Sequence, residues 1–189
     1  MIYTDSLKIP LVAILAMAAG SYAGASAMAG PESQKVLGQL AQASIAEVQL
    51  GHLAQAKSTN PVVKKFAGRM IEDHTALLKD TQAVASRQNV ALPTMPTAQD
   101  TAEMNRLRAL SGKNFDAAYI NYMLQDHRND INMLSGEKPA LHDRDVYSLV
   151  QRAQPILENH VRAAENVAGE LGLPARPGFN QPVHPSGTE

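Results

Sequence analysis

The chain has 189 residues, with 17 basic and 18 acidic side chains and an isoelectric point near 6.6. This length suits one domain with a sizeable core, and the balanced charge excludes the basic surface that nucleic-acid binding requires. The sequence has no cysteine, which excludes disulfides and thiolate metal ligands, so any metal ion must be held by histidine and carboxylate groups.

The first 29 residues have the pattern of a secretory signal peptide. Lys8 supplies a weakly positive start, an apolar stretch follows, and small residues permit cleavage near Ala27 or Ala29. We therefore predict that the protein is periplasmic or secreted. The alternative is a membrane anchor formed by residues 9–29, which are just long enough to span a bilayer. Membrane contact is expected only through this segment, if it stays uncleaved.

Apolar residues recur at helical spacing from residue 33 onward, which predicts four long helices. The start of the second helix is the clearest, because Asn60 can cap it and Pro61 suits the first helical position. The third is expected to stop at Ser135-Gly136 and Pro139. The expected helices span residues 33–57, 61–89, 114–134 and 143–171.

The connection between the second and third long helices, residues 90–113, is too long for a simple turn. Residues 97–110 within it can form a short helix. Such a crossover can join two parallel helices, as it does in ferritin-like bundles. The predicted fold class is therefore all-α, a ferritin-like antiparallel four-helix bundle over residues 33–173. Residues 174–189, rich in proline and glycine, are expected to be disordered.

A short element occurs twice in the helical region. Residues 70–74 read Met-Ile-Glu-Asp-His, and residues 123–127 read Met-Leu-Gln-Asp-His. An aromatic residue precedes each copy by four positions, Phe66 in the first and Tyr119 in the second. Aspartate and histidine on the inner face of a helix must be paired or bind a ligand, so the repeat predicts buried polar chemistry.

Six side chains that can ligate a metal interrupt the apolar stripes of the four helices, or lie beside them. Four of them, one on each helix, are near the midpoint of that helix, so packing brings them to a single level. We therefore expect one buried polar centre. Its candidate residues are Glu47, Asp73, His74, Asp126, His127 and His160.

These residues also carry a family resemblance, which covers roughly residues 33–173. The matching stretches are residues 46–51, residues 63–67 with Met70, Asp73 and His74, residues 115–119 with Met123, Asp126 and His127, and Pro155 with Leu157 and His160. They resemble an exported bacterial family catalogued as domain of unknown function 4142 and placed among ferritin-like bundles. The resemblance implies the fold but assigns no activity.

The di-metal members of the ferritin-like group use Glu-x-x-His pairs, which place both ligands on one face. Here aspartate and histidine are adjacent and point about 100° apart around the helix axis. Both cannot point at one ion, so we expect one to ligate while the other orients a ligand from a neighbouring helix. Iron oxidase chemistry is therefore not carried over.

Two hypotheses of function remain open. In the first, the centre binds a transition metal ion such as zinc, copper or iron. In the second, the aspartate–histidine pairs form a hydrogen-bond network in a structural or stress-related envelope protein. A catalytic domain without metal is less favoured, since no phosphate-binding glycine loop, nucleophile elbow or zinc-protease motif is present.

Overall fold

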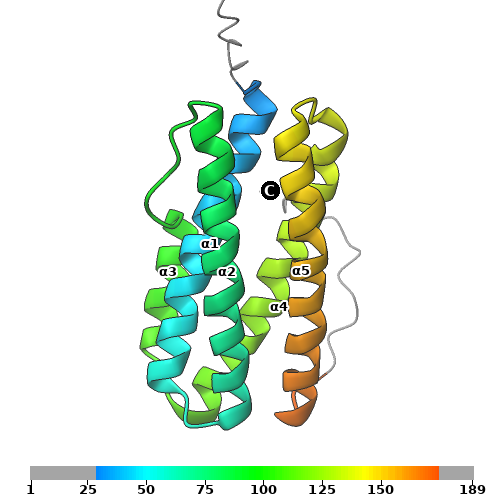
Figure 1. Cartoon of the computed structure of the whole chain (residues 1–189). Helices are drawn as coiled ribbons and strands as arrows, with labels where there is room; N and C mark the ends of the chain where they lie inside the picture. The colour runs from blue at the N-terminus through cyan, green and yellow to red at the C-terminus, as the bar shows by residue number, and fades with distance from the viewer. Residues whose placement is uncertain (1–28, 175–189) are drawn as a thin grey trace, which may run out of the picture.

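The computed structural model describes residues 29–174, which form a bundle of long helices (Figure 1). The predicted signal segment, except its last residue, and the predicted tail, except its first, lie outside this range. Within the described part no helix is long and apolar enough to cross a bilayer. The helices are α1 (Pro31–Lys57), α2 (Pro61–Arg87), α3 (Ala98–Arg108), α4 (Gly112–Glu137) and α5 (Arg144–Glu170), with a 3-10 turn at Lys138–Ala140.

Local capping signals set several of these boundaries. Asn60 Oδ1 accepts a hydrogen bond from the backbone N–H of Val62 at 2.9 Å, and Pro61 is the first residue of α2. Thr97 and Asp100 form a reciprocal capping box at the start of α3. The all-helical prediction is thus confirmed, with the long helices where the sequence pattern placed them.

Of the two stop signals expected at the end of α4, Pro139 acts as predicted and Ser135-Gly136 does not. Gly136 stays helical, and the change to the 3-10 turn comes at Lys138, three residues beyond Ser135. The residue that stops the α-helix is Pro139, because it has no N–H to continue the bonding pattern.

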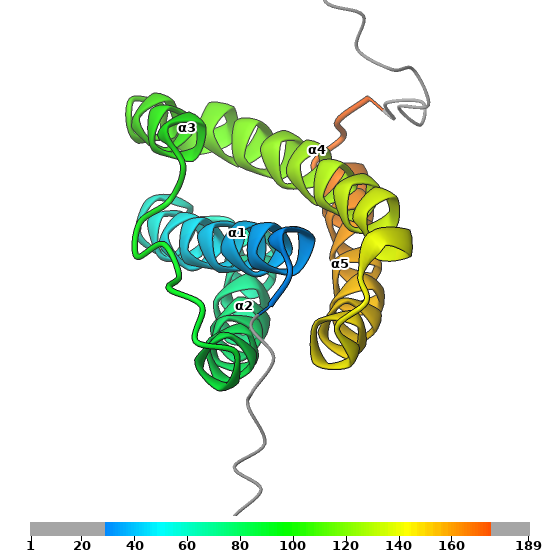
Figure 2. The same ribbon diagram turned by 90° about the horizontal axis from the view of Figure 1, so that it is seen from above.

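The long helices are arranged as two antiparallel pairs, α1 with α2 and α4 with α5, and α2 also contacts α5 (Figures 1 and 2). The chain leaves the end of α2, returns along the bundle over α1, and passes through α3 before α4 begins. As a result α2 and α4 run in the same direction (Figure 1). The long crossover and its short helix are present as predicted.

The bundle has two apolar clusters, one toward each end. One includes Phe66 and Tyr119, and the other includes Leu37 and Leu149. Between the two clusters, each long helix contributes one buried side chain that can ionise, with an exposure of 2% or less. These side chains are Glu47, His74, His127 and His160. Burial of four such groups is unfavourable unless they are paired or bind a ligand.

Candidate metal centre

The repeated element explains how two of the histidines meet. Because α2 and α4 run in the same direction (Figure 1), the two copies face each other across the core at the same level. The aromatic residues Phe66 and Tyr119 make an edge-to-face contact at 6.1 Å between ring centroids, and His74 and His127 do the same at 5.3 Å. The aromatic pair packs in the apolar cluster, so the histidine pair is held at the bundle's mid-level.

Three imidazoles converge at this level, from α2, α4 and α5. His127 Nε2 lies 3.3 Å from His74 Nε2 and 3.1 Å from His160 Nδ1. All three nitrogens lie within 4.8 Å of one another. We call this group the three-histidine cluster.

Two of the rings are oriented by hydrogen bonds made by their other nitrogen. His127 Nδ1 lies 3.0 Å from the carbonyl oxygen of Met123, one turn earlier on α4. His160 Nε2 lies 2.8 Å from Asp73 Oδ2. The same Asp73 oxygen accepts from Arg69 Nε at 3.2 Å. The aspartate of the first repeat therefore orients a histidine of a neighbouring helix, as the 100° angle between adjacent residues led us to expect.

These partners fix the position of the ring protons. A carbonyl oxygen only accepts, so His127 Nδ1 carries its hydrogen, and Nε2 of the neutral ring has a lone pair. Asp73 as a carboxylate likewise accepts from His160 Nε2–H, which leaves a lone pair on His160 Nδ1. Two lone pairs therefore face each other at 3.1 Å. This repulsive arrangement favours a positive centre at the cluster: a proton, a metal ion, or the Nε2–H of His74, which lies 3.3 Å from His127 Nε2.

The buried surroundings of the three imidazoles disfavour their protonation. Burial lowers the pKa of His74 well below its ordinary value, and the His127 and His160 rings lower it further. Burial, with a smaller contribution from His160, lowers the pKa of His127 to about 3. For His160, burial outweighs the opposing effect of Asp73, so its pKa is also lowered. The cluster is thus a set of neutral imidazoles, the form in which histidine binds metals.

Two of the predicted carboxylates lie on the other side of His127. Glu47 Oε1 is 3.8 Å from His127 Nδ1, and a carboxylate oxygen of Asp126 lies within 4.8 Å of both. Glu47 is fully buried, and neither of its oxygens has a hydrogen-bond partner among the described residues. Burial raises the pKa of the Glu47 carboxyl well above its ordinary value, and Asp126 raises it further.

The six predicted residues are therefore brought to one level but divided into two groups. The histidines converge with Asp73 behind them, whereas Glu47 and Asp126 face each other across from the second nitrogen of His127. The second repeat does not copy the first, since Asp126 approaches Glu47 of α1 and makes no hydrogen bond to an imidazole among the described residues. The six residues therefore do not form one centre with equivalent members.

Sequence reasoning missed three groups beside these carboxylates. Asp130 lies one turn beyond Asp126 on α4, and its pKa is raised well above the ordinary value by burial, then by Asp126 and Asp100. Tyr122 donates a hydrogen bond from its hydroxyl to Asp100 Oδ1 at 2.9 Å. The signal for Asp130 was its i, i+4 spacing from Asp126, while Asp100 comes from the crossover and had no sequence signal.

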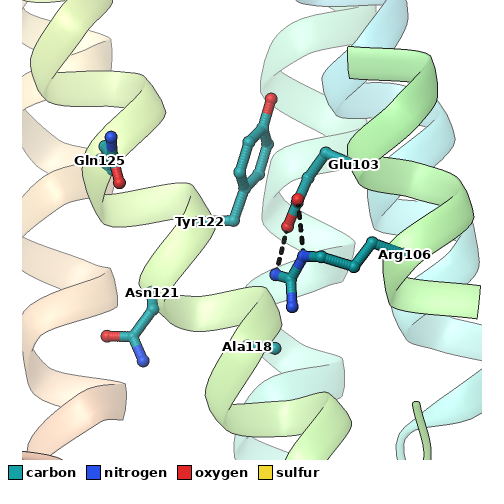
Figure 3. A pocket seen from close by; sticks show the side chains of 6 residues that line it. All are labelled: Glu103, Arg106, Ala118, Asn121, Tyr122 and Gln125. Atoms are coloured by element: carbon teal, nitrogen blue, oxygen red, sulfur yellow. Dashed lines mark hydrogen bonds and ion pairs between the residues drawn. The ribbon is translucent and has the colours of Figure 1, made fainter. Parts of the chain in front are cut away.

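A surface hollow lies between α3 and α4 beside this acidic region (Figure 3). Its volume is about 440 Å³, and Tyr122 forms part of its wall opposite the Glu103–Arg106 ion pair. The residues that line it are Glu103, Arg106, Ala118, Asn121, Tyr122 and Gln125.

The nitrogen spacing in the three-histidine cluster fits a metal ion. Zinc bound to histidine has Zn–N distances of about 2.0–2.1 Å, which in tetrahedral geometry separates neighbouring nitrogens by about 3.3 Å. The separations of 3.3 and 3.1 Å from His127 Nε2 agree with this value. The third pair of nitrogens, on His74 and His160, lies within 4.8 Å.

Fold and side chains together define an all-helical bundle domain with a buried histidine and carboxylate core. The chain belongs to a family catalogued as a domain of unknown function, DUF4142, whose model matches residues 18–167. Its structure is similar to the crystal structure of a DUF305 fragment from Deinococcus radiodurans, with a TM-score of 0.67 and 18% sequence identity. That match covers 76% of this chain and 99% of the fragment, and it shows the fold alone. No protein of curated function matches the chain.

Proposed function

We propose that this domain is an exported, ferritin-like bundle that binds a transition metal ion between His74 Nε2, His127 Nε2 and His160 Nδ1. The observation that carries the proposal is the pair of lone pairs facing each other at 3.1 Å, each fixed by a hydrogen bond on the far side of its ring. A metal ion converts this repulsion into coordination. Orientation of ligating imidazoles by a carbonyl and a carboxylate is common in protein metal sites.

The ligand set narrows the choice of metal. Imidazole ligands without thiolates favour zinc, Cu(II) or non-haem iron. Three histidines leave at least one coordination position of a tetrahedral ion for water or another small ligand. Asp73 and the Met123 carbonyl act on the metal only through the rings that they orient.

One observation favours a second candidate function. The 2.8 Å contact between His160 and Asp73 also suits an imidazolium, which would donate from Nδ1 to His127 Nε2. The domain would then be a structural envelope protein with a metal-free polar network. The lowered pKa of His160 opposes this alternative.

The metal content of untagged protein separates the two candidates. We expect about one equivalent of zinc, copper or iron, lost in His74→Gln and His127→Gln but retained in His52→Gln, because His52 is exposed. His74→Gln is the better-controlled variant, since His74 Nδ1 makes no hydrogen bond among the described residues that the substitution would remove. A chelator should lower the melting temperature of the wild type. Metal-free protein that is indifferent to both zinc and chelator would support the structural network instead.

Export is tested separately by cell fractionation. We expect the chain to lie outside the cytoplasm, shortened to a start near Ala27 or Ala29. A full-length chain in the membrane fraction would favour the uncleaved anchor.

A further inference from the structure

The carboxylates beside His127 form a group that the three-histidine cluster does not use. Glu47 projects from α1, and Asp126 and Asp130 project from successive turns of α4. We call these residues the acidic triad. Asp100 lies nearby, but its oxygens are occupied: Oδ2 accepts from Thr97 and Oδ1 accepts from Tyr122.

Glu47 is the member that needs an explanation. Its side chain is fully buried, yet neither carboxylate oxygen accepts a hydrogen bond from any described residue. An unpartnered buried carboxyl costs folding free energy, about 1–3 kcal/mol or more when charged. The His127 Nδ1–H is directed to the Met123 carbonyl at 3.0 Å and remains 3.8 Å from Glu47. Glu47 instead faces Asp126, with which it forms a hydrogen bond only when one of the two carboxyls is protonated.

No lysine or arginine among the described residues forms an ion pair with the acidic triad. Among the described residues, the ion pairs of lysine and arginine go to other acids, such as Arg128 to Glu165 and Arg69 to Asp73. Burial raises the pKa of each triad carboxyl. At Glu47 and Asp130 neighbouring carboxyls raise it further, whereas at Asp126 the hydrogen bond with Glu47 partly offsets the rise. The group offers several oxygen atoms that can ligate a cation, and no lysine or arginine in the described part of the chain pairs with it.

We propose that Glu47 and Asp126, whose oxygens approach within 4.8 Å, form the core of a second cation site, which takes a hard divalent ion such as Mn²⁺ on the side of His127 that faces away from the three-histidine cluster. Oxygen ligands of this kind suit Mn²⁺, Mg²⁺ and Ca²⁺. Tyr122, close to this site, hydrogen-bonds Asp100 and lines the α3–α4 hollow (Figure 3).

The second site shares no ligand with the first, so the two are tested independently. Metal-free full-length protein is titrated with Mn²⁺, and free Mn²⁺ is followed by its electron paramagnetic resonance signal. We expect a single equivalent to bind both wild type and His74→Gln. Affinity should fall by more than about 10-fold in Glu47→Gln and Asp126→Asn, since each removes an oxygen ligand. Glu72→Gln, an exposed acid on α2, is the matched control.

Each variant removes charge from a crowded buried group, so we expect all of them to fold, as circular dichroism will show. The absence of Mn²⁺ binding in folded wild type would overturn the proposal and leave a proton shared between Glu47 and Asp126. Mn²⁺ binding that is lost in His74→Gln, or retained in Glu47→Gln or Asp126→Asn, would also overturn it. If Mn²⁺ binds as expected but no zinc, copper or iron binds at the histidines, only the proposed function fails.

Discussion

His127 Nδ1 lies 3.8 Å from Glu47 Oε1, but it donates its hydrogen to the Met123 carbonyl. The imidazole therefore does not compensate the buried glutamate. The His127 ring thus lies between two buried polar groups that differ in chemistry. On its Nε2 side, neutral imidazoles present lone pairs to a cation. On its Nδ1 side, carboxyls that lack counterions crowd one another.

Glu47→Gln should stabilise the metal-free protein at neutral and alkaline pH. The folded-state pKa of Glu47 is raised above its ordinary value of 4.5, so its contribution to stability is complete below about pH 4.5 and is lost as pH rises. Glutamine does not titrate. The stability gap between variant and wild type should therefore widen with pH, by up to about 1.4 kcal/mol per pH unit. Urea unfolding in chelator at about pH 5, 6.5 and 8 measures it; a gap independent of pH would contradict the assignment.

The metal-free histidine cluster should destabilise the fold in mild acid. The pKa values of His74 and His127 are lowered below the ordinary 6.5, so these rings stabilise the folded state above about pH 6.5. That contribution is lost as pH falls toward the folded pKa, which is about 3 for His127. The Glu47→Gln background suits this measurement, because the glutamate acts in the opposite direction. An unfolding free energy that stays constant from about pH 7 to 5 would contradict the prediction.

Asp73→Asn should weaken metal binding without removing a ligand. Asparagine can still accept from His160 Nε2–H, but it lacks the charge that strengthens the imidazole as a donor to metal. Loss of such a supporting group typically costs about 10–100-fold in affinity. Competition with a zinc indicator gives the affinity, and the neighbouring exposed acid provides the control in Glu72→Gln. Equal affinities for Asp73→Asn and the wild type would show that Asp73 serves only the fold.

Much of the fold could be predicted from the sequence because its signals are local. Asn60 and Pro61 set the start of α2 by their own chemistry. The shared level of Glu47 and His160 follows from their position halfway along helices of similar length. The helical repeat places such residues without any knowledge of the neighbouring helices.

The division of the site could not be predicted in the same way. Helical geometry gives the angle between Asp73 and His74, but the partner in that direction depends on which helix lies there. For Asp73 it is α5, which supplies His160, whereas for Asp126 it is α1, which supplies Glu47. The repeat is therefore symmetric in sequence and asymmetric in contacts. Ring orientation is equally non-local, because it rests on hydrogen bonds formed after packing.

Gly51 is expected to set the distance between α1 and α2 next to the centre. A Cβ atom at this position would lie 2.7 Å from Ile71 Cγ1 and 3.1 Å from the Ala67 carbonyl oxygen. Gly51→Ala should therefore destabilise the protein by about 1–3 kcal/mol through overpacking, less up to about 1 kcal/mol from better helix propensity. Gly136→Ala is the control, because a Cβ there meets no atom within 4 Å, and it should be neutral or stabilising.

A double variant separates the two contacts of the added methyl group at Gly51. Ile71→Ala removes the closer contact, so Gly51→Ala should cost less in that background than in the wild type, with a coupling energy of about 0.5 kcal/mol or more. The contact with the Ala67 carbonyl persists, because backbone cannot move aside without separating the helices. Part of the cost should therefore remain in the double variant, as measured by urea unfolding. Strict additivity would mean that Ile71 moves freely and that the backbone contact alone limits how closely α1 and α2 approach.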